Sequence, residues 1–454
     1  MTMSKVTDLL SIMSLNSLRY LYLIKIRIGY FPMSQKIWML VILGLMITHL
    51  SAKEQAPSDT TTSKRNIPGW LEKFTLSGYG VVNYYNYKWE TLPDKRNAID
   101  PERLNMYLKY NFNDKIEFKA EIEFEHGGTG STMAFDPLEE FGEFEKEIEY
   151  GGAVSLEQIN ILFKINKAIN IRLGKMRVYL GNASKQDRPI QYFTPYRSEL
   201  ENTILPLGWY ETGVELSGDF ELKKNEEYPK LSYKVYVMSG LDNTGFSSLN
   251  WIKRGYQTRF ETINANSFAY AGRLDYVFGK GSEVGFNVYA NNPSPNRPKN
   301  DFKEKSWLVY GDVHFTYSKH PWRVAALGMF GHIQNSEALS NANRNLSNNL
   351  DVKRTPVGKM AAGAYVEAGY DVLSFVKKEI KQELYPFARL EWYDSMLKTQ
   401  GNIFNNPRYE RQVYSVGLNY LPIKQIVLKA SYAWRILGTE QKEKTFAMGV
   451  GFSF

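Results

Sequence analysis

Apolar and polar side chains alternate with a period of two along most of the chain, from about residue 73 to the C-terminus. In the segment 102–112, Leu104 and Met106 alternate with Arg103 and Asn105. A period of two places one set of side chains on each face of a β-strand. Many segments run about 10–12 residues, the length of a tilted membrane-spanning strand. The pattern therefore predicts strands with one apolar and one polar face.

Counting these segments predicts 16 strands. Their expected ranges are 73–87, 102–112, 115–126, 154–165, 168–178, 207–219, 230–240, 268–278, 283–292, 305–317, 322–333, 359–373, 382–394, 410–421, 425–436 and 444–454.

Long and short connections alternate between the predicted strands. The long ones are 88–101, 127–153, 179–206, 241–267, 293–304, 334–358 and 395–409, and the short ones are 113–114, 166–167, 279–282, 318–321 and 422–424. Bacterial outer-membrane barrels show this asymmetry, with short periplasmic turns and long external loops. The predicted fold class is all-β: a transmembrane antiparallel up-and-down β-barrel of 16 strands over residues 73–454.

The N-terminal region has the pattern of an export signal. In residues 33–52, Lys36 precedes an apolar run of about 11 residues and a small-residue site follows at Ser51 and Ala52. We expect residues 1–52 to comprise an extension and this signal peptide, with translation starting at Met33, and residues 53–72 to be a periplasmic lead-in. A membrane anchor is the alternative. Cleavage of the signal would place the mature protein in the outer membrane of a Gram-negative bacterium.

The last predicted strand ends in aromatic residues. Phe452 and the terminal Phe454 continue an alternation with Gly451 and Ser453. The pattern is similar to the terminal signature of outer-membrane proteins that the barrel-assembly machinery recognises. We expect Phe452 and Phe454 to be that insertion signal. An ordinary half-buried strand is the alternative interpretation.

Composition excludes several classes of protein. The chain has no cysteine and five histidines, without the His spacing of a metal-binding helix, so no metal or cofactor is expected. The formal charge is +8, but residues 1–52 contain five basic side chains and one acidic, which leaves +4 for the rest. Such a mixed-sign chain offers no broad basic field, so nucleic acid is not an expected partner.

A barrel of this size predicts a water-filled channel, because 16–18 strands leave an open lumen. Charged residues would line it, since charges are costly in a dry core. The predicted function is a porin for passive diffusion of small hydrophilic solutes. The expected lumenal charges include Lys119, Glu121, Arg273, Asp275, Asp312, His314, Arg389 and Glu391.

The third long connection, 179–206, is expected to fold inward and narrow the pore. Cations gather in it and on the strand before it: Arg172, Lys175, Arg177, Lys185, Arg188 and Arg197. A change of alternation near Gly174 suggests a bulge that turns Lys175 and Arg177 toward the lumen. We hypothesise that Arg177 and Arg188 stay unpaired and favour anions. Alternatively the cations lie in bulk water or are neutralised by Glu199, Glu201, Glu211 and Glu215.

The second long connection contains an acidic stretch at 135–150 with seven carboxylates and one lysine. Clustered carboxylates could bind divalent cations at the lipopolysaccharide surface or contact a neighbouring subunit. A solvated acidic loop with a helical turn is the third interpretation.

Several stretches resemble the phosphate-selective porin O and P family. They are FTLSGYG at 74–80, LEQINILFKINKAINIRLGKMRVYLG at 156–181, LPLGWYETGVELSGDF at 205–220, YSVGLNYLPIKQIVLKASYAW at 414–434 and the Phe-ended last strand. The resemblance covers roughly residues 70–454. It implies a homotrimeric 16-stranded channel with periplasmic termini and a basic third loop. Dense Arg and Lys ladders give that family its phosphate selectivity, and this chain has no obvious complete ladder, so the architecture carries over better than the specificity.

Two other functions stay open. A barrel can act as an adhesin or have a structural role. It can also be an enzyme, which needs a nucleophile beside a base, and His314 is the histidine placed mid-strand for that role. No serine-centred motif stands beside it in the sequence, so a non-enzymatic channel is the first choice.

Overall fold

The structure is a computed structural model, which describes residues 69–127, 132–134, 147–149, 153–206, 208–224, 226–257, 262–346, 353–376 and 381–454. The predicted signal peptide at 33–52 and nearly all of the predicted lead-in at 53–72 lie outside these residues. So does most of the acidic stretch at 135–150.

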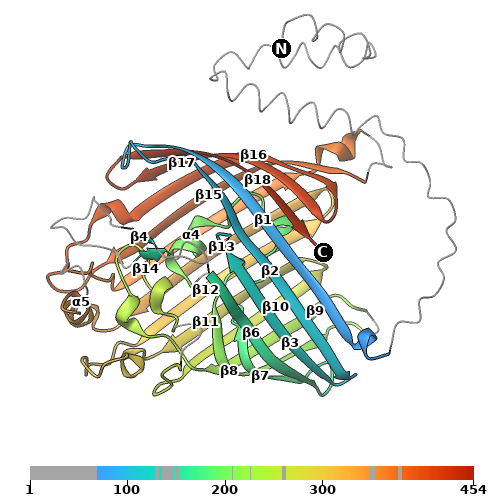
Figure 1. The fold of residues 1–454 in the computed structure, drawn as a ribbon, viewed down its shortest axis with the longest axis horizontal. Helices are drawn as coiled ribbons and strands as arrows, with labels where there is room; N and C mark the ends of the chain where they lie inside the picture. Colours follow the sequence, from blue (N-terminus) through green and yellow to red (C-terminus); the bar gives the residue numbers. More distant parts are fainter. Residues whose placement is uncertain are drawn as a thin grey trace, which may run out of the picture. The chain divides into compact units, whose positions relative to one another are not determined.

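Sixteen strands form one closed antiparallel barrel, in which β18 (Lys442–Ser453) pairs with β1 (Phe74–Trp89) to complete the ring (Figure 1). The predicted fold class is therefore confirmed. The remaining barrel strands are β2 (Ala98–Asn113), β3 (Ile116–Glu125), β6 (Ala153–Lys164), β7 (Asn170–Arg177), β8 (Tyr210–Glu221), β9 (Lys230–Met238), β10 (Ala269–Gly279), β11 (Ser282–Asn291), β12 (Leu308–Lys319), β13 (Trp322–Ile333), β14 (Met360–Tyr370), β15 (Glu383–Lys398), β16 (Glu410–Ile423) and β17 (Ile426–Leu437).

Alternation along each strand separates an apolar outer face from a polar inner face. On β12 the side chain of Val313 is 61% exposed, whereas that of the neighbouring Asp312 is 4% exposed. On β15, Leu390 is 53% exposed and Arg389 is 2% exposed. A soluble protein would bury these outward aliphatic side chains, so the outer face is built to contact an apolar medium.

The two ends of the barrel differ in their connections. At one end, called here the short-turn end, connections such as 280–281, 320–321 and 424–425 are tight. At the other, the long-loop end, lie 126–152, 178–209, 239–268, 292–307 and 334–359. Three connections depart from the expected asymmetry: 222–229 and 371–382 are long for the short-turn end, and 438–441 is short for the long-loop end. Among the described residues, no helix is long and apolar enough to cross a membrane.

Aromatic side chains form a belt around the outside of the short-turn end. Their ring contacts link neighbouring strands in the pairs Phe74–Tyr110, Phe220–Tyr233 and Trp322–Tyr370, and reach across β11 in the pair Phe278–Phe315. Aromatic rings prefer the boundary between hydrocarbon and water. The belt is therefore placed where a membrane interface would lie.

The seam between the first and last strands depends on two glycines of β1. A Cβ atom on Gly80 would lie 2.6 Å from the ring of Phe452, and one on Gly78 would lie 2.7 Å from the ring of Phe454. The backbone N–H of Phe454 donates to the carbonyl of Gly78 at 2.9 Å. The two C-terminal rings thus cover glycines at the closing edge, so Phe452 and Phe454 also pack the seam. Their role as an insertion signal remains a prediction.

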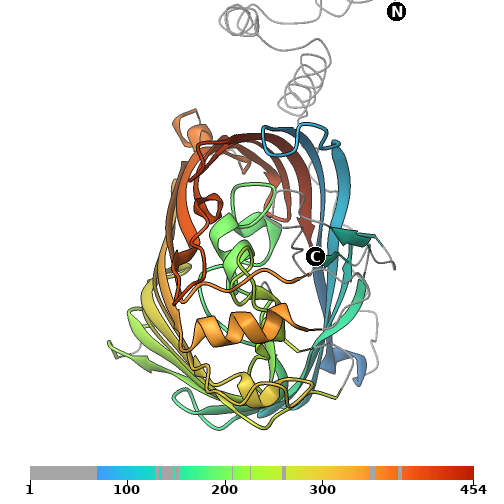
Figure 2. The ribbon, with the colours of Figure 1, turned by 90° about the vertical axis from the view of Figure 1, so that its left-hand side faces the viewer.

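Short elements inside the connections were not expected from the alternation. They are the hairpin of β4 (Thr132–Ala134) and β5 (Glu147–Glu149), helix α4 (Glu199–Ile204) and helix α5 (Ser336–Arg344). Figure 2 shows helical segments within the ring of strands. The connection at 178–209, called here the constriction loop, contains α4, which contacts β14 and β15. Because such short elements are stabilised by the wall they pack on, local sequence carries little signal for them.

Candidate solute pathway and constriction loop

The constriction loop crosses the barrel interior and packs on it with apolar side chains. Leu200 and Ile204 of α4 are fully buried in a cluster that also contains Met176 of β7. Farther along the loop, Phe193 stacks on Phe387 of β15, with ring centroids 5.0 Å apart and an interplanar angle of 8°. Burial of this kind stabilises an ordered loop. The expected inward fold of the third long connection is therefore what the structure has.

One carboxylate of the loop lies in a cage of three arginines, two from the wall and one from the loop itself. Asp187 is 5% exposed, and its oxygens lie 3.0 Å from Arg103, 2.7 Å from Arg177 and 2.6 Å from Arg197. The Tyr79 hydroxyl donates to the same carboxylate at 2.5 Å. Burial alone would raise the pKa of Asp187, but the three guanidinium groups hold that pKa well below its usual range. Asp187 is thus a fixed negative charge.

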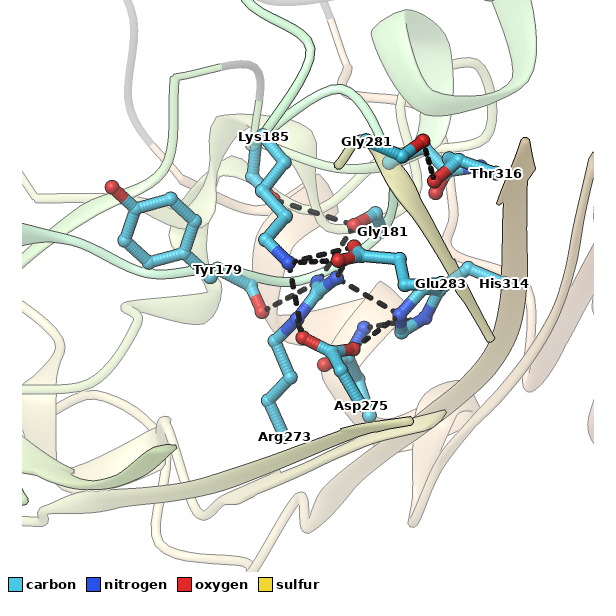
Figure 3. Close-up of polar contacts among 12 residues, drawn as sticks. Tyr179, Gly181, Lys185, Arg273, Asp275, Gly281, Glu283, His314 and Thr316 are labelled. Carbon is cyan, nitrogen blue, oxygen red and sulfur yellow. Dashed lines mark hydrogen bonds and ion pairs between the residues drawn. The ribbon is translucent and has the colours of Figure 1, made fainter. Parts of the chain in front are cut away.

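Two residues away, the loop offers a cation to carboxylates of the wall (Figure 3). The ammonium of Lys185 lies 2.5 Å from Glu283 and 3.1 Å from Asp275. Arg273 also binds both carboxylates, Asp275 at 2.7 Å and Glu283 at 3.1 Å, and it donates to the carbonyl oxygen of Gly181 at 3.0 Å. The cluster joins β10 and β11 to the loop through both side chains and backbone.

Other contacts hold the backbone of the loop. Glu201 is 3% exposed and accepts from the N–H groups of Asn182 at 2.8 Å and Ala183 at 2.9 Å, and from the Tyr365 hydroxyl at 3.1 Å. Among the described residues, no cation lies within ion-pair distance of Glu201. Burial raises its pKa to about 7, because those hydrogen bonds compensate only in part for lost hydration.

A buried lysine completes the set of anchors. Lys429 of β17 is 3% exposed, and its ammonium donates to the loop carbonyls of Tyr192 at 2.6 Å and Thr194 at 2.9 Å. Nearby, Arg323 donates to the carbonyl of Ile190 at 2.9 Å. The wall therefore fixes the loop by hydrogen bonds to its main chain as well as by ion pairs to its side chains.

The predicted constriction cations differ in their ion pairs and exposure. The hypothesis that Arg177 is unpaired is wrong, because it lies 2.9 Å from Glu121 and 2.7 Å from Asp187. Arg197 is caged with it. Arg188 is exposed and forms no ion pair with another described residue.

The remaining two lie on β7. Arg172 lies 3.5 Å from Glu215, and Lys175 donates to the wall carbonyl of Leu156 at 2.9 Å. The expected bulge at Gly174 is also wrong: β7 pairs with both neighbours without a register shift, although Gly174 itself adopts a φ of 120°.

The predicted neutralising carboxylates are mostly not the partners found. Glu215 pairs with Arg172, but Glu199 pairs with Arg435 of β17 at 2.8 Å. Glu211 accepts from the Trp209 indole at 3.0 Å and from the N–H of Gly240 at 2.8 Å. Asp187 was not expected at the site, since a single aspartate among loop charges has no distinguishing pattern in the sequence.

The expected lumenal charges point inward, but those at mid-height are not surrounded by water. Seven of these side chains are each at most 5% exposed: Glu121, Arg273, Asp275, Asp312, His314, Arg389 and Glu391. Arg389, for example, lies 2.5 Å from Glu367 and 3.2 Å from Glu391. The loop covers these groups, and they neutralise one another instead of depending on hydration.

Accessible lumenal charge lies toward the short-turn end, on the wall of β2–β9. Lys109 is 42% exposed, Lys164 is 40% exposed, and Lys234 is 25% exposed at the side chain. Lys119 lies opposite Lys109 in the strand register and forms no ion pair with a described residue. We call this surface the vestibule: Lys109, Lys119, Lys164, Arg172, Lys230 and Lys234, with the carboxylates of Glu117, Glu215 and Asp219.

In the vestibule, cations outnumber carboxylates. Glu117 is shared by Lys109 at 3.8 Å and Lys164 at 3.0 Å, and Glu215 is shared by Arg172 and Lys234. Of these cations, only Lys119 and Arg172 were expected from the sequence to face the lumen or the constriction. The others occupy inward positions of the same alternation, so counting inward charges on every strand would have found them.

One interior cluster, around His314, has residue types that also occur in metal sites and in hydrolytic sites. Ligand atoms of Asp275, Glu283 and His314 lie within 4.8 Å of one another, which resembles a metal site. Lys185 and Arg273 form ion pairs with both carboxylates and so already neutralise their negative charge. The ring nitrogens of His314 contact Asp275 at 2.7 Å and Asp312 at 3.0 Å, and no described serine or threonine hydroxyl is bonded to that ring. The arrangement is therefore that of an ion-pair network.

Comparisons with known proteins find distant likenesses. No protein-family model matches the chain. An uncharacterized protein of Aquifex aeolicus (strain VF5) is 25% identical over 362 residues, which is 79% of this chain and 74% of that protein.

Solved structures with a similar course of the chain include three outer-membrane proteins. They are a loop L8 deletion mutant of OmpT of Vibrio cholerae (13% identity, TM-score 0.46, 84% of this chain and 100% of that one), an anion-selective porin from Comamonas acidovorans (9%, 0.48, 84% and 99%) and Salmonella typhi OmpF in complex with daunomycin (14%, 0.49, 84% and 97%). At these values the fold assignment rests on the strand pairing described above rather than on the likeness.

Proposed function

We propose that the chain is an outer-membrane porin of a Gram-negative bacterium: a non-enzymatic channel for passive diffusion of small hydrophilic solutes. The observation that carries the proposal is the closed 16-stranded barrel with an apolar outer face and a charged inner face. In hydrocarbon every backbone N–H and C=O must be paired within the protein, and a closed barrel meets that demand. The aromatic belt at the short-turn end supports the same placement.

The narrower part of the proposal is a preference for anions. It is supported by the excess of cations in the vestibule and by the exposed Arg188 on the constriction loop. Fixed cations around a narrow aqueous passage raise the local anion concentration. Membership in the phosphate-selective porin O and P family and assembly into a homotrimer remain predictions from the sequence, as does contact with lipopolysaccharide.

The test is conductance of the purified full-length protein in a planar bilayer. We expect discrete current steps whose size rises with KCl concentration, because a wet passage conducts bulk electrolyte. Heat-unfolded protein at the same dose is the matched control. Folded protein that inserts into the bilayer and gives no steps would contradict the channel and favour the structural or adhesin role.

A further inference from the structure

We propose that the connection 371–382 holds a membrane anchor at the short-turn end. Its short 3-10 helix, η8 (Val372–Phe375), inserts Phe375 and the following Val376 among the acyl chains of a phospholipid leaflet. Residues 372–376 are called here the η8 anchor. The inference rests on the proposed placement of the barrel in an outer membrane, and it deepens that placement by assigning a lipid contact to a segment beyond the strands.

Two apolar side chains of the η8 anchor project away from the protein. Phe375 is 76% exposed and Val376 is 64% exposed, which is more than the outward Val313 at 61% and Leu390 at 53% on the strands. Single exposed apolar side chains are common on protein surfaces. Two adjacent ones that continue an apolar wall form a contact surface instead.

Phe375 lies on the outer side of the barrel wall. Its ring stacks on that of Tyr370, with centroids 5.0 Å apart and an interplanar angle of 24°. Tyr370 is four residues from the outward Val366, which is 44% exposed, so both side chains share the outer face of β14. Tyr370 also meets Trp322 of the aromatic belt at 4.7 Å and 77°. The η8 anchor therefore extends the belt past the ends of the strands.

Hydrogen bonds hold the η8 anchor in this position. The side chain of Asp371 is 3% exposed, and its carboxylate accepts from the N–H groups of Leu373 at 3.1 Å and Leu384 at 2.9 Å. The same carboxylate lies 2.8 Å from Nε2 of His320, and the Ser374 hydroxyl donates to the carbonyl of Asp371 at 2.6 Å. The exposure of the two apolar side chains is thus built into an ordered turn.

The outer wall beside the η8 anchor has a groove of about 280 Å³. It is lined by the rings of Trp322 and Tyr370 and by the smaller side chains of Ala368, Pro386 and Ala388. The small residues leave space next to the aromatic rings, and acyl methylene groups can fill that space with van der Waals contacts. The groove and the η8 anchor share Tyr370, so one lipid contact surface includes both.

The charges near the η8 anchor favour a lipid surface over a second copy of this chain. Lys319, Lys381 and Lys424 belong to neighbouring connections of the short-turn end, and all three are exposed. Of the carboxylates beside them, Asp371 is covered and Glu383 accepts from a tyrosine hydroxyl at 2.9 Å. Exposed cations around apolar side chains complement anionic headgroups. A two-fold contact between copies would instead bring lysines together.

The experiment uses the absence of cysteine from the chain, because one introduced cysteine can then carry a nitroxide label. Full-length protein labelled at Phe375→Cys or Val376→Cys is reconstituted into vesicles of phosphatidylethanolamine and phosphatidylglycerol. Electron paramagnetic resonance compares collisions of the label with oxygen, which concentrates in hydrocarbon, and with a water-soluble nickel chelate. We expect oxygen collisions to dominate at both positions, at a depth of about 5–10 Å below the headgroups.

Two further labels are the controls. Lys280→Cys lies in a tight turn of the same end, where collisions with the nickel chelate should dominate. Leu390→Cys, on the outer face of β15, tests the membrane placement of the barrel itself, and oxygen should dominate there. A heat-modifiable band on a gel verifies that each labelled variant is folded.

Three results would overturn the proposal, and they separate its failure from that of the proposed function. Dominance of the nickel chelate at Phe375→Cys and Val376→Cys, with oxygen dominant at Leu390→Cys, would refute the η8 anchor and leave the barrel in the membrane. Few collisions with either reagent, in micelles and vesicles alike, would assign the η8 anchor to contact with a second copy. Dominance of the nickel chelate at Leu390→Cys would refute the membrane placement and the anchor together.

Discussion

Asp187 and Glu201 are two carboxylates of the same constriction loop, almost equally buried at 5% and 3% exposure, yet their surroundings differ in kind. Asp187 is enclosed by Arg103, Arg177 and Arg197, and its pKa is held well below the usual range. Glu201 accepts from backbone N–H groups and a tyrosine, and burial raises its pKa to about 7. Burial alone therefore does not decide the charge of a loop carboxylate; the partners do.

The largest expected effect is at Asp187. Asp187→Asn leaves three buried guanidinium groups without their shared anion, and breaking a buried pair in this way costs about 3–5 kcal/mol. We expect the free energy of unfolding in detergent micelles, followed by tryptophan fluorescence in guanidinium chloride, to fall by that amount. Asp219→Asn removes a 41%-exposed partner of Lys230 and should cost at most about 1 kcal/mol. Equal losses for both variants would refute the cage.

Glu201 and Asp187 should also differ in how they make the folding stability depend on pH. Its folded-state pKa of about 7 exceeds the unfolded value, so the folded state binds the proton more tightly. Stability should therefore decline as pH rises from about 5 to 7, by on the order of 3 kcal/mol, and level off above. Glu201→Gln should flatten this decline in equilibrium unfolding. Asp187, with its lowered pKa, contributes stability that is lost only at acidic pH, so Asp187→Asn should leave the slope between pH 5 and 7 unchanged.

A smaller effect is expected at Lys185. Its side chain is 33% exposed, and Arg273 still pairs with Asp275 and Glu283 after its removal. We expect Lys185→Met to cost about 1–2 kcal/mol in the same unfolding measurement, between the values for exposed and buried pairs. A loss as large as that of Asp187→Asn would show that Arg273 does not compensate.

Most of the fold could be predicted from the sequence, because a lipid-facing barrel imposes a strict alternation on every strand. Leu104, Met106 and their partners specify inner and outer faces without any knowledge of the neighbours. The interior of the lumen could not be predicted in the same way. Whether Arg177 is free or caged depends on Asp187, Glu121 and Tyr210, which come from different segments and meet only after the loop has folded.

The same limit explains the other corrections. The expected lumenal position of Lys175 required a bulge at Gly174, but the register is unbroken there, so Lys175 lies on the opposite face of β7 from Arg172, beside the outward Ile159. The neutralisation of Arg273 by Asp275 and Glu283 needs the register of β10 and β11. Which inward charges pair with one another therefore depends on the closed barrel. Which charges face inward, and their signs, can be predicted from the sequence.

Ion-paired charges such as Asp187 anchor the constriction loop, whereas we propose that Lys119 and Arg188, which form no ion pair with a described residue, select solutes. The most direct test is the reversal potential across a planar bilayer in a low-salt KCl gradient, where screening is weakest. Wild type should prefer chloride, and Lys119→Glu combined with Arg188→Glu should shift the potential toward cation preference. Lys185→Met, which removes a loop cation paired with Asp275 and Glu283, should shift it much less. If the double variant keeps the wild-type potential, or Lys185→Met shifts it as far, the assignment of selectivity to Lys119 and Arg188 is contradicted.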